Sequence, residues 1–111
     1  MEISSLNEMK KGWFVGNFEP SIIKTDKVEV AVKEYKAGDY EKKHYHKIAK
    51  EITVIISGEI MMNNKKMEKG DIVILEPFEP SDFRAITDSI DVVVKIPGES
   101  NDKYLLEVEE K

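Results

Sequence analysis

Short apolar segments, separated by glycine and proline, form the main pattern along this chain. Val28–Lys33 places three valines on one face of an extended segment, because alternate residues of a strand point the same way. Ile52–Ile56 and Ile72–Leu75 are apolar on both faces, and Val92–Ile96 is a fourth segment rich in β-branched residues. Such residues favour strands, so the pattern predicts an all-β fold.

A tight hairpin is predicted near the middle of the chain. Glu59–Met62 and Lys65–Met67 flank Asn63-Asn64, and asparagine tolerates the left-handed conformation that such a turn requires. Many short strands at even spacing are typical of an antiparallel sandwich or barrel.

The composition is that of one globular domain. The chain has 111 residues, of which 41% are hydrophobic and 35% charged, so residues 1–111 can form a single domain with its own core. Helical periodicity is weak and is limited to Ser5–Trp13 and Asp102–Glu110, near the two ends. We expect these ends to be short extensions of the β domain.

Net charge and cysteine content restrict which partners and which cellular compartment are expected for this protein. The net charge is −5 and the lysines are interspersed with acids, so no basic stripe is available to bind nucleic acid. The chain has no cysteine, which excludes disulfides and thiolate metal sites and fits a reducing compartment. Met1–Lys11 lacks the apolar core of a secretory signal, and no apolar stretch approaches the length of a membrane span. We therefore expect a cytoplasmic protein.

A strand that is apolar on both faces needs a layer of protein packed against each face. One face can fill the interior of a barrel, and the other needs a second layer. A partner subunit can supply that layer, which predicts a homodimer; the alternative is that the same chain covers the face.

The two histidines of the chain lie two residues apart, as His44 and His46. Residues i and i+2 of a strand share a face, so both imidazoles can converge on one point above the sheet. Glu51 follows five residues later, at the start of the next apolar segment. Two imidazoles and a carboxylate suit a divalent transition metal, Zn, Fe, Mn, Ni or Cu. The alternative is that the two histidines are simply exposed on an edge strand and have no function.

The spacing around these residues resembles the first motif of the cupin family. That motif reads G, five residues, H-x-H, three or four residues, E, six residues, G, and the chain meets it with Gly38, His44, His46, Glu51 and Gly58. The resemblance covers about residues 28–97. It implies a jelly-roll β-barrel with a metal bound at its open end by the two histidines and the glutamate.

The second cupin motif is incomplete in this chain. Gly70 opens it well, but Ser81 stands where the family places its metal-binding histidine. In a regular strand Ser81 and Phe83 face inward, which the more apolar character of that face favours. A one-residue bulge would instead direct Asp82 to the metal as a further ligand.

Further residues are candidates for binding a small-molecule ligand. Tyr40 shares the parity of the histidines and can line the mouth, together with Ser81 and Phe83. Arg84 is the only arginine; it can hold a carboxylate or phosphate, or simply pair with an acid at the surface.

Three functions remain open at this point. The complete first motif favours a metal-binding cupin that acts on or binds a small polar molecule. Small cupins that isomerise nucleotide-linked keto sugars without a metal are the second possibility, since their H-x-H pair moves protons. The missing second-motif histidine favours the third, a non-catalytic cupin that binds or senses a ligand.

Overall fold

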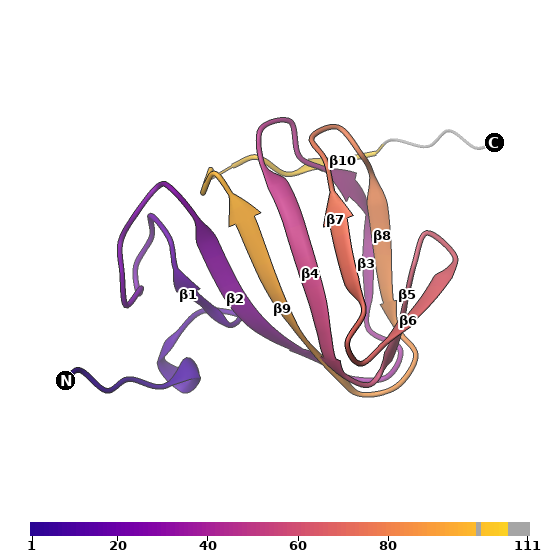
Figure 1. Cartoon of the computed structure of the whole chain (residues 1–111), viewed down its shortest axis with the longest axis horizontal. Coiled ribbons are helices and arrows are strands. Elements are labelled where there is room, and N and C mark those ends of the chain that lie inside the picture. Colours follow the sequence, from indigo (N-terminus) through magenta and orange to yellow (C-terminus); the bar gives the residue numbers. More distant parts are fainter. Residues whose placement is uncertain (100, 107–111) are drawn as a thin grey trace.

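Two antiparallel sheets of five strands face each other in the structure, a computed structural model that describes residues 1–99 and 101–106 (Figure 1). The strand order is β1-β2-β9-β4-β7 in the first sheet, named sheet A, and β10-β3-β8-β5-β6 in the second, named sheet B. The elements are η1 (Leu6–Glu8), β1 (Trp13–Val15), β2 (Glu29–Tyr35), β3 (Tyr40–Tyr45), β4 (Lys50–Ser57), β5 (Glu59–Met62), β6 (Lys65–Glu68), β7 (Ile72–Leu75), β8 (Ser81–Ala85), β9 (Ser89–Ile96) and β10 (Tyr104–Leu105).

The predicted all-β jelly roll is confirmed, because consecutive strands pass repeatedly between the two sheets. The hydrophobic core fills one end of the interior. It consists of buried side chains from β4, β5 and β8: Ile55, Ile60, Met62, Phe83 and Ala85. The opposite end contains the residues of the predicted site.

Turns hold these strands in place as the sequence predicts. Asn63 and Asn64 have φ angles of 50° and 65°, and they join β5 to β6 in the expected hairpin. Gly58, the last glycine of the first motif, has a φ of +86°, and a Cβ there would lie 2.3 Å from the carbonyl oxygen of Asp88. Any larger residue at this position would therefore push β4 away from the start of β9.

The weak helical periodicity at the two ends does not correspond to an α-helix in the described residues. Within Ser5–Trp13 only Leu6–Glu8 forms a short 3-10 helix, and Trp13 begins β1. Near the other end Tyr104 and Leu105 pair with the edge of β3, while residues 107–110 lie outside the described part of the chain. An isolated short helix is marginal in water, whereas an open sheet edge offers backbone hydrogen bonds at once. In residues 1–99 and 101–106, no helix is long and apolar enough to span a membrane.

The outer face of sheet A is aliphatic from β2 to β7. Strand register aligns two rows of four β-branched side chains across β2, β9, β4 and β7: Val30, Val94, Ile52 and Ile74 in one row, and Val32, Val92, Val54 and Ile72 in the next. Ile72 and Ile74 are 63% and 53% exposed, so the described residues leave this edge of the face uncovered.

A candidate metal centre

The three predicted ligands come together at the mouth of the jelly roll. His44 lies near the end of β3, and His46 is the first residue after that strand. Glu51 lies near the start of β4. One donor atom from each lies within 4.8 Å of the other two, and the imidazole rings are 5.5 Å apart and nearly perpendicular. The first motif therefore predicted the placement of all three side chains.

Both imidazoles are held by backbone carbonyl groups. Nδ1 of His44 donates to the carbonyl oxygen of Lys42 at 2.9 Å, and Nδ1 of His46 donates to the carbonyl oxygen of Asp102. A carbonyl oxygen can only accept, so in both neutral rings the proton is on Nδ1 and Nε2 carries a lone pair. Histidines that bind a metal through one ring nitrogen typically donate the N–H of the other ring nitrogen to an acceptor, as both rings do here.

Nε2 of His46 lies 3.2 Å from a carboxylate oxygen of Glu51. With a neutral ring, these two atoms are both acceptors, and both groups are largely buried. Such a pair needs a positive species between or on its members: either a proton on His46 or a metal cation held by both. The residues present therefore fit a divalent metal, without a thiolate or a third histidine.

Burial and neighbouring charges shift the pKa values of two of the predicted ligands, His44 and Glu51. Burial lowers the pKa of His44, and the positive charge of Lys103 adds to this. For Glu51, burial opposes ionisation, but the hydrogen bond and charge of His46 outweigh it and the pKa of Glu51 is lowered. Metal ions bind neutral imidazole, so the lowered pKa of His44 favours coordination, whereas the lowered pKa of Glu51 reflects the alternative in which His46 carries the proton.

Asp102 fixes the loop between His46 and Glu51, a role that no sequence motif indicates. Its carboxylate accepts backbone N–H bonds from three consecutive residues: Lys47 at 2.9 Å, Ile48 at 3.1 Å and Ala49 at 2.9 Å. Asp102 is only 2% exposed. Burial opposes its ionisation, but these N–H donors outweigh it and lower the pKa of Asp102. The residue lies more than fifty positions after the loop, so no local motif marks it.

A β-bulge in β3 corrects the prediction for Tyr40. Glu41 pairs with Phe83 and His44 with Ser81, so three steps along β3 match two along β8. The extra residue reverses the alternation and brings Glu41, not Tyr40, to the interior. Tyr40 is 50% exposed and stacks under Arg84 at 5.2 Å. Neither Tyr40 nor Arg84 lines the site in the described chain.

In the second motif, Ser81 and Phe83 face inward, as expected for a regular strand without a bulge. Ser81 and Phe83 are buried, at 3% and 4% exposure, and both line the interior next to the candidate metal centre. Asp82 uses a carboxylate oxygen to accept the backbone N–H of Asn63 at 2.8 Å, and it lies outside the His/His/Glu group. The candidate centre thus offers three protein donors in the described chain: His44, His46 and Glu51.

Two hollow spaces adjoin these donors. A cavity of about 30 Å³, large enough for a water molecule, lies deeper in the interior and is lined by His44, Glu51 and Asp91, among others. An open cleft of about 730 Å³ lies above, and its walls include all three predicted ligands, Trp13 and two lysines of sheet A, Lys33 and Lys95. That volume is in the range of small-molecule sites.

Comparison with known proteins yields structural matches only. No protein-family model and no curated protein sequence matches the chain. Among solved structures, a conserved protein with a double-stranded β-helix domain from Klebsiella pneumoniae is similar over 96% of this chain and 92% of its own, at 23% identity and a TM-score of 0.71. An RmlC-like cupin from Shewanella frigidimarina is similar over 69% and 72%, at 16% identity and a TM-score of 0.65.

Oxalate decarboxylase from Bacillus subtilis, described with Mn(II) centres, is similar over 74% of this chain but only 25% of its own, at 17% identity and a TM-score of 0.64. At these identities the similarity concerns the fold.

Proposed function

We propose that this chain, whose fold is that of the cupins, binds one divalent transition metal and uses it to hold a small polar molecule in the cleft. His44, His46 and Glu51 would be the protein ligands. The observation that carries the proposal is the pair of backbone-fixed imidazoles, whose Nε2 lone pairs converge with a carboxylate. The Mn(II) centres named for the oxalate decarboxylase neighbour support the same reading.

A bound metal would supply a Lewis acid that polarises a ligand oxygen or lowers the pKa of bound water. The chain's own residues would prepare the site. The carbonyl groups of Lys42 and Asp102 fix the rings, and the buried Ser81, at the position of the motif's missing histidine, lines the small cavity together with His44 and Glu51.

Metal content is the first expected result. Protein dialysed against Mn²⁺, Zn²⁺, Fe²⁺ or Ni²⁺ should retain about one ion per chain with at least one of them, measured by elemental analysis. The His44→Ala variant should lose at least tenfold in affinity for that ion, because it removes one of three donors.

Tyr40→Ala is the matched control, since Tyr40 lies on β3 but outside the site. It should bind metal like the unmodified chain. Metal retained by His44→Ala would refute the proposed site. A protein that binds none of the ions would point instead to the shared proton of His46 and Glu51, and so to acid–base chemistry without a metal.

The aliphatic outer face of sheet A supports a second proposal, a homodimer formed through that face. A second copy brings the same two rows of β-branched side chains, and two such surfaces bury each other without an unpaired charge. An uncovered aliphatic surface on an edge strand would otherwise promote aggregation.

Ile74→Lys should convert the dimer to a monomer, with at least a tenfold rise in the dissociation constant, because it places a charge in the apolar contact. Light scattering coupled to size exclusion measures this. Ile86→Lys is the control, since Ile86 is 40% exposed and follows β8 in sheet B. An unmodified chain that is monomeric at high concentration would contradict the dimer.

A further inference from the structure

Two lysines on the inner face of sheet A lie beside the candidate metal centre. Lys33 on β2 and Lys95 on β9 have side chains that are 22% and 12% exposed. Their Nζ atoms lie 5.8 Å and 5.7 Å from the centre of the Trp13 ring, which covers them both. Inner-face lysines beneath an aromatic ring are unusual, because burying an ammonium group costs free energy unless an anion accompanies it.

Each lysine already has one carboxylate partner. Lys33 lies 3.4 Å from Glu41, and Lys95 lies 3.3 Å from Glu29. Glu51 adds a third carboxylate on the same inner surface, and the register places it opposite Lys95. Three carboxylates and two ammonium groups leave one negative charge, which a divalent metal would convert to one positive charge.

The other charged groups around the cleft do not remove this excess. Asp91 lines the deeper cavity and not the cleft, and burial raises its pKa to about 7, so it is protonated in about half of the molecules at pH 7 and in most of them below that pH. At the rim, three ammonium groups stand against three carboxylates: Lys10, Lys11 and Lys103, with Glu19, Glu99 and Asp102. The metal-loaded cleft would therefore hold one uncompensated positive charge in a partly buried place.

We propose that the metal-loaded cleft takes a small organic molecule carrying a single carboxylate. This inference rests on the proposed function. A monoanion neutralises the excess charge, and a carboxylate has two oxygens, so it can meet the metal and an ammonium donor at once. Lys95 is the more buried donor, and Trp13 provides a flat apolar wall for the carbon skeleton. A simple inorganic ion would leave most of the 730 Å³ cleft empty.

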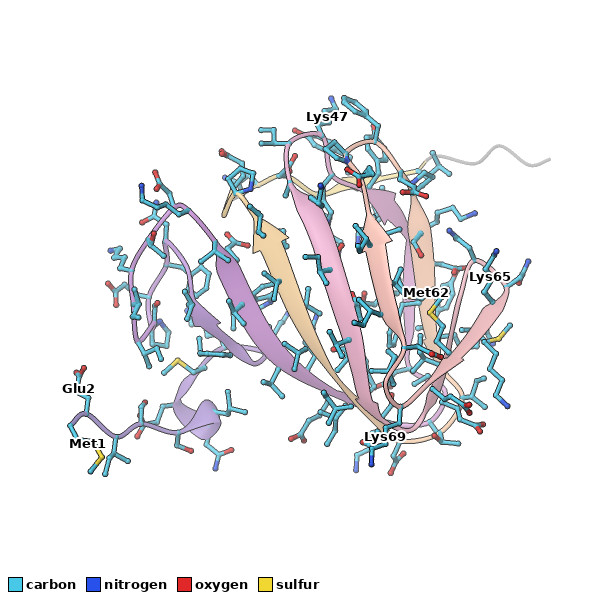
Figure 2. All side chains as sticks on the ribbon, in the orientation of Figure 1. Met1, Glu2, Lys47, Met62, Lys65 and Lys69 are labelled. Carbon is cyan, nitrogen blue, oxygen red and sulfur yellow. The ribbon has the colours of Figure 1, made fainter. Side chains whose placement is uncertain are left out.

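The test compares benzoate with benzamide, which has nearly the same shape but no charge. With the full chain loaded with the metal that it binds, benzoate should raise the melting temperature and give a calorimetric binding signal, and benzamide should bind at least tenfold more weakly. Lys95→Met should weaken benzoate binding about tenfold at unchanged metal content. Lys69→Met is the control, because Lys69 lies at the end of the molecule opposite Lys47, the neighbour of the metal ligand His46 (Figure 2).

Metal content, measured before benzoate is added, separates the two proposals. Metal bound without any preference for benzoate, or with benzoate binding unaffected by Lys95→Met, overturns the carboxylate site alone. A chain that binds no metal overturns the proposed function, and the carboxylate site with it. Equal benzoate binding by metal-free protein also counts against the inference, because the charge excess requires the metal.

Discussion

The unmodified chain is expected to lose stability as the pH rises from about 4 to about 8, and replacing Asp91 with asparagine is expected to remove most of that loss. Asp91 is 1% exposed, and one of its carboxylate oxygens is buried without a partner among the described residues. Burial raises the pKa of Asp91 to about 7 from an ordinary value of 3.8. Lys33 opposes this rise, while the charges of Glu41 and Glu51 add to it.

The direction follows from proton binding. Between the two pKa values the folded chain holds a proton on Asp91 and the unfolded chain does not, so folding is favoured at low pH. That contribution is complete below about pH 4 and is lost as the pH rises through about 7. A difference of about three pKa units corresponds to about 4 kcal/mol in the free energy of unfolding. The amide of Asp91→Asn has no proton to lose, so this contribution disappears.

Urea denaturation of metal-free protein at about pH 5 and about pH 8 measures about 3 kcal/mol of this effect, because about two of the three pKa units lie between pH 5 and the folded-state pKa of about 7. Chelation keeps metal binding, which depends on pH for its own reasons, out of the comparison. Asp88→Asn is the control, because Asp88 is an exposed carboxylate just before the same strand. Parallel pH dependence in Asp91→Asn and the unmodified chain would show that Asp91 ionises normally.

Residue spacing predicted those parts of the structure that depend on local geometry. Asn63 and Asn64 have few alternatives to a tight turn, and the apolar alternation of Ser81, Phe83 and Ala85 set the register of β8. The placement of the three candidate metal ligands required one further step, the resemblance to a family motif. Spacing within one strand indicates that two histidines share a face, but it does not bring a glutamate from the next strand to the same point.

Long-range contacts and a change in alternation were not predictable. Nothing near Asp102 indicates that its carboxylate binds a loop more than fifty residues earlier in the sequence. The bulge in β3 brings Glu41 to the interior and Tyr40 to the surface, and no residue in that segment marks it. Strict alternation therefore gave the wrong face for Tyr40.

Sheet A also reverses the usual distribution of polar and apolar residues. In an antiparallel sheet with one solvated face, the polar residues normally point to water. Here Lys33, Asp91 and Lys95 point inward beside the buried Ala31 and Val93, while Val32, Val92 and Val94 point outward. The two proposals account for this reversal together: a metal and an anionic ligand would satisfy the inner charges, and a second subunit would cover the outer aliphatic rows.

Removal of the Asp102 carboxylate is expected to affect both stability and the metal centre. Asp102→Ala should lower the free energy of unfolding by about 3 kcal/mol, because three N–H groups that bind one buried carboxylate lose their charged acceptor. Metal affinity should also fall about tenfold. The carbonyl group of Asp102 holds His46, and the freed loop leads directly to Glu51, so both ligands lose their fixed positions.

Asp71→Ala is the matched control for this prediction. Asp71 accepts a single side-chain-to-backbone N–H bond, from Glu68 at 2.9 Å, in the exposed turn between β6 and β7, so its loss should cost about 1 kcal/mol or less. Denaturant unfolding and metal competition, carried out on both variants, separate the two roles of Asp102. If Asp102→Ala loses stability but binds metal as tightly as Asp71→Ala, the carboxylate anchors the chain end alone. Weakened metal binding in the folded Asp102→Ala variant is the result expected if the same carboxylate also positions His46 and Glu51.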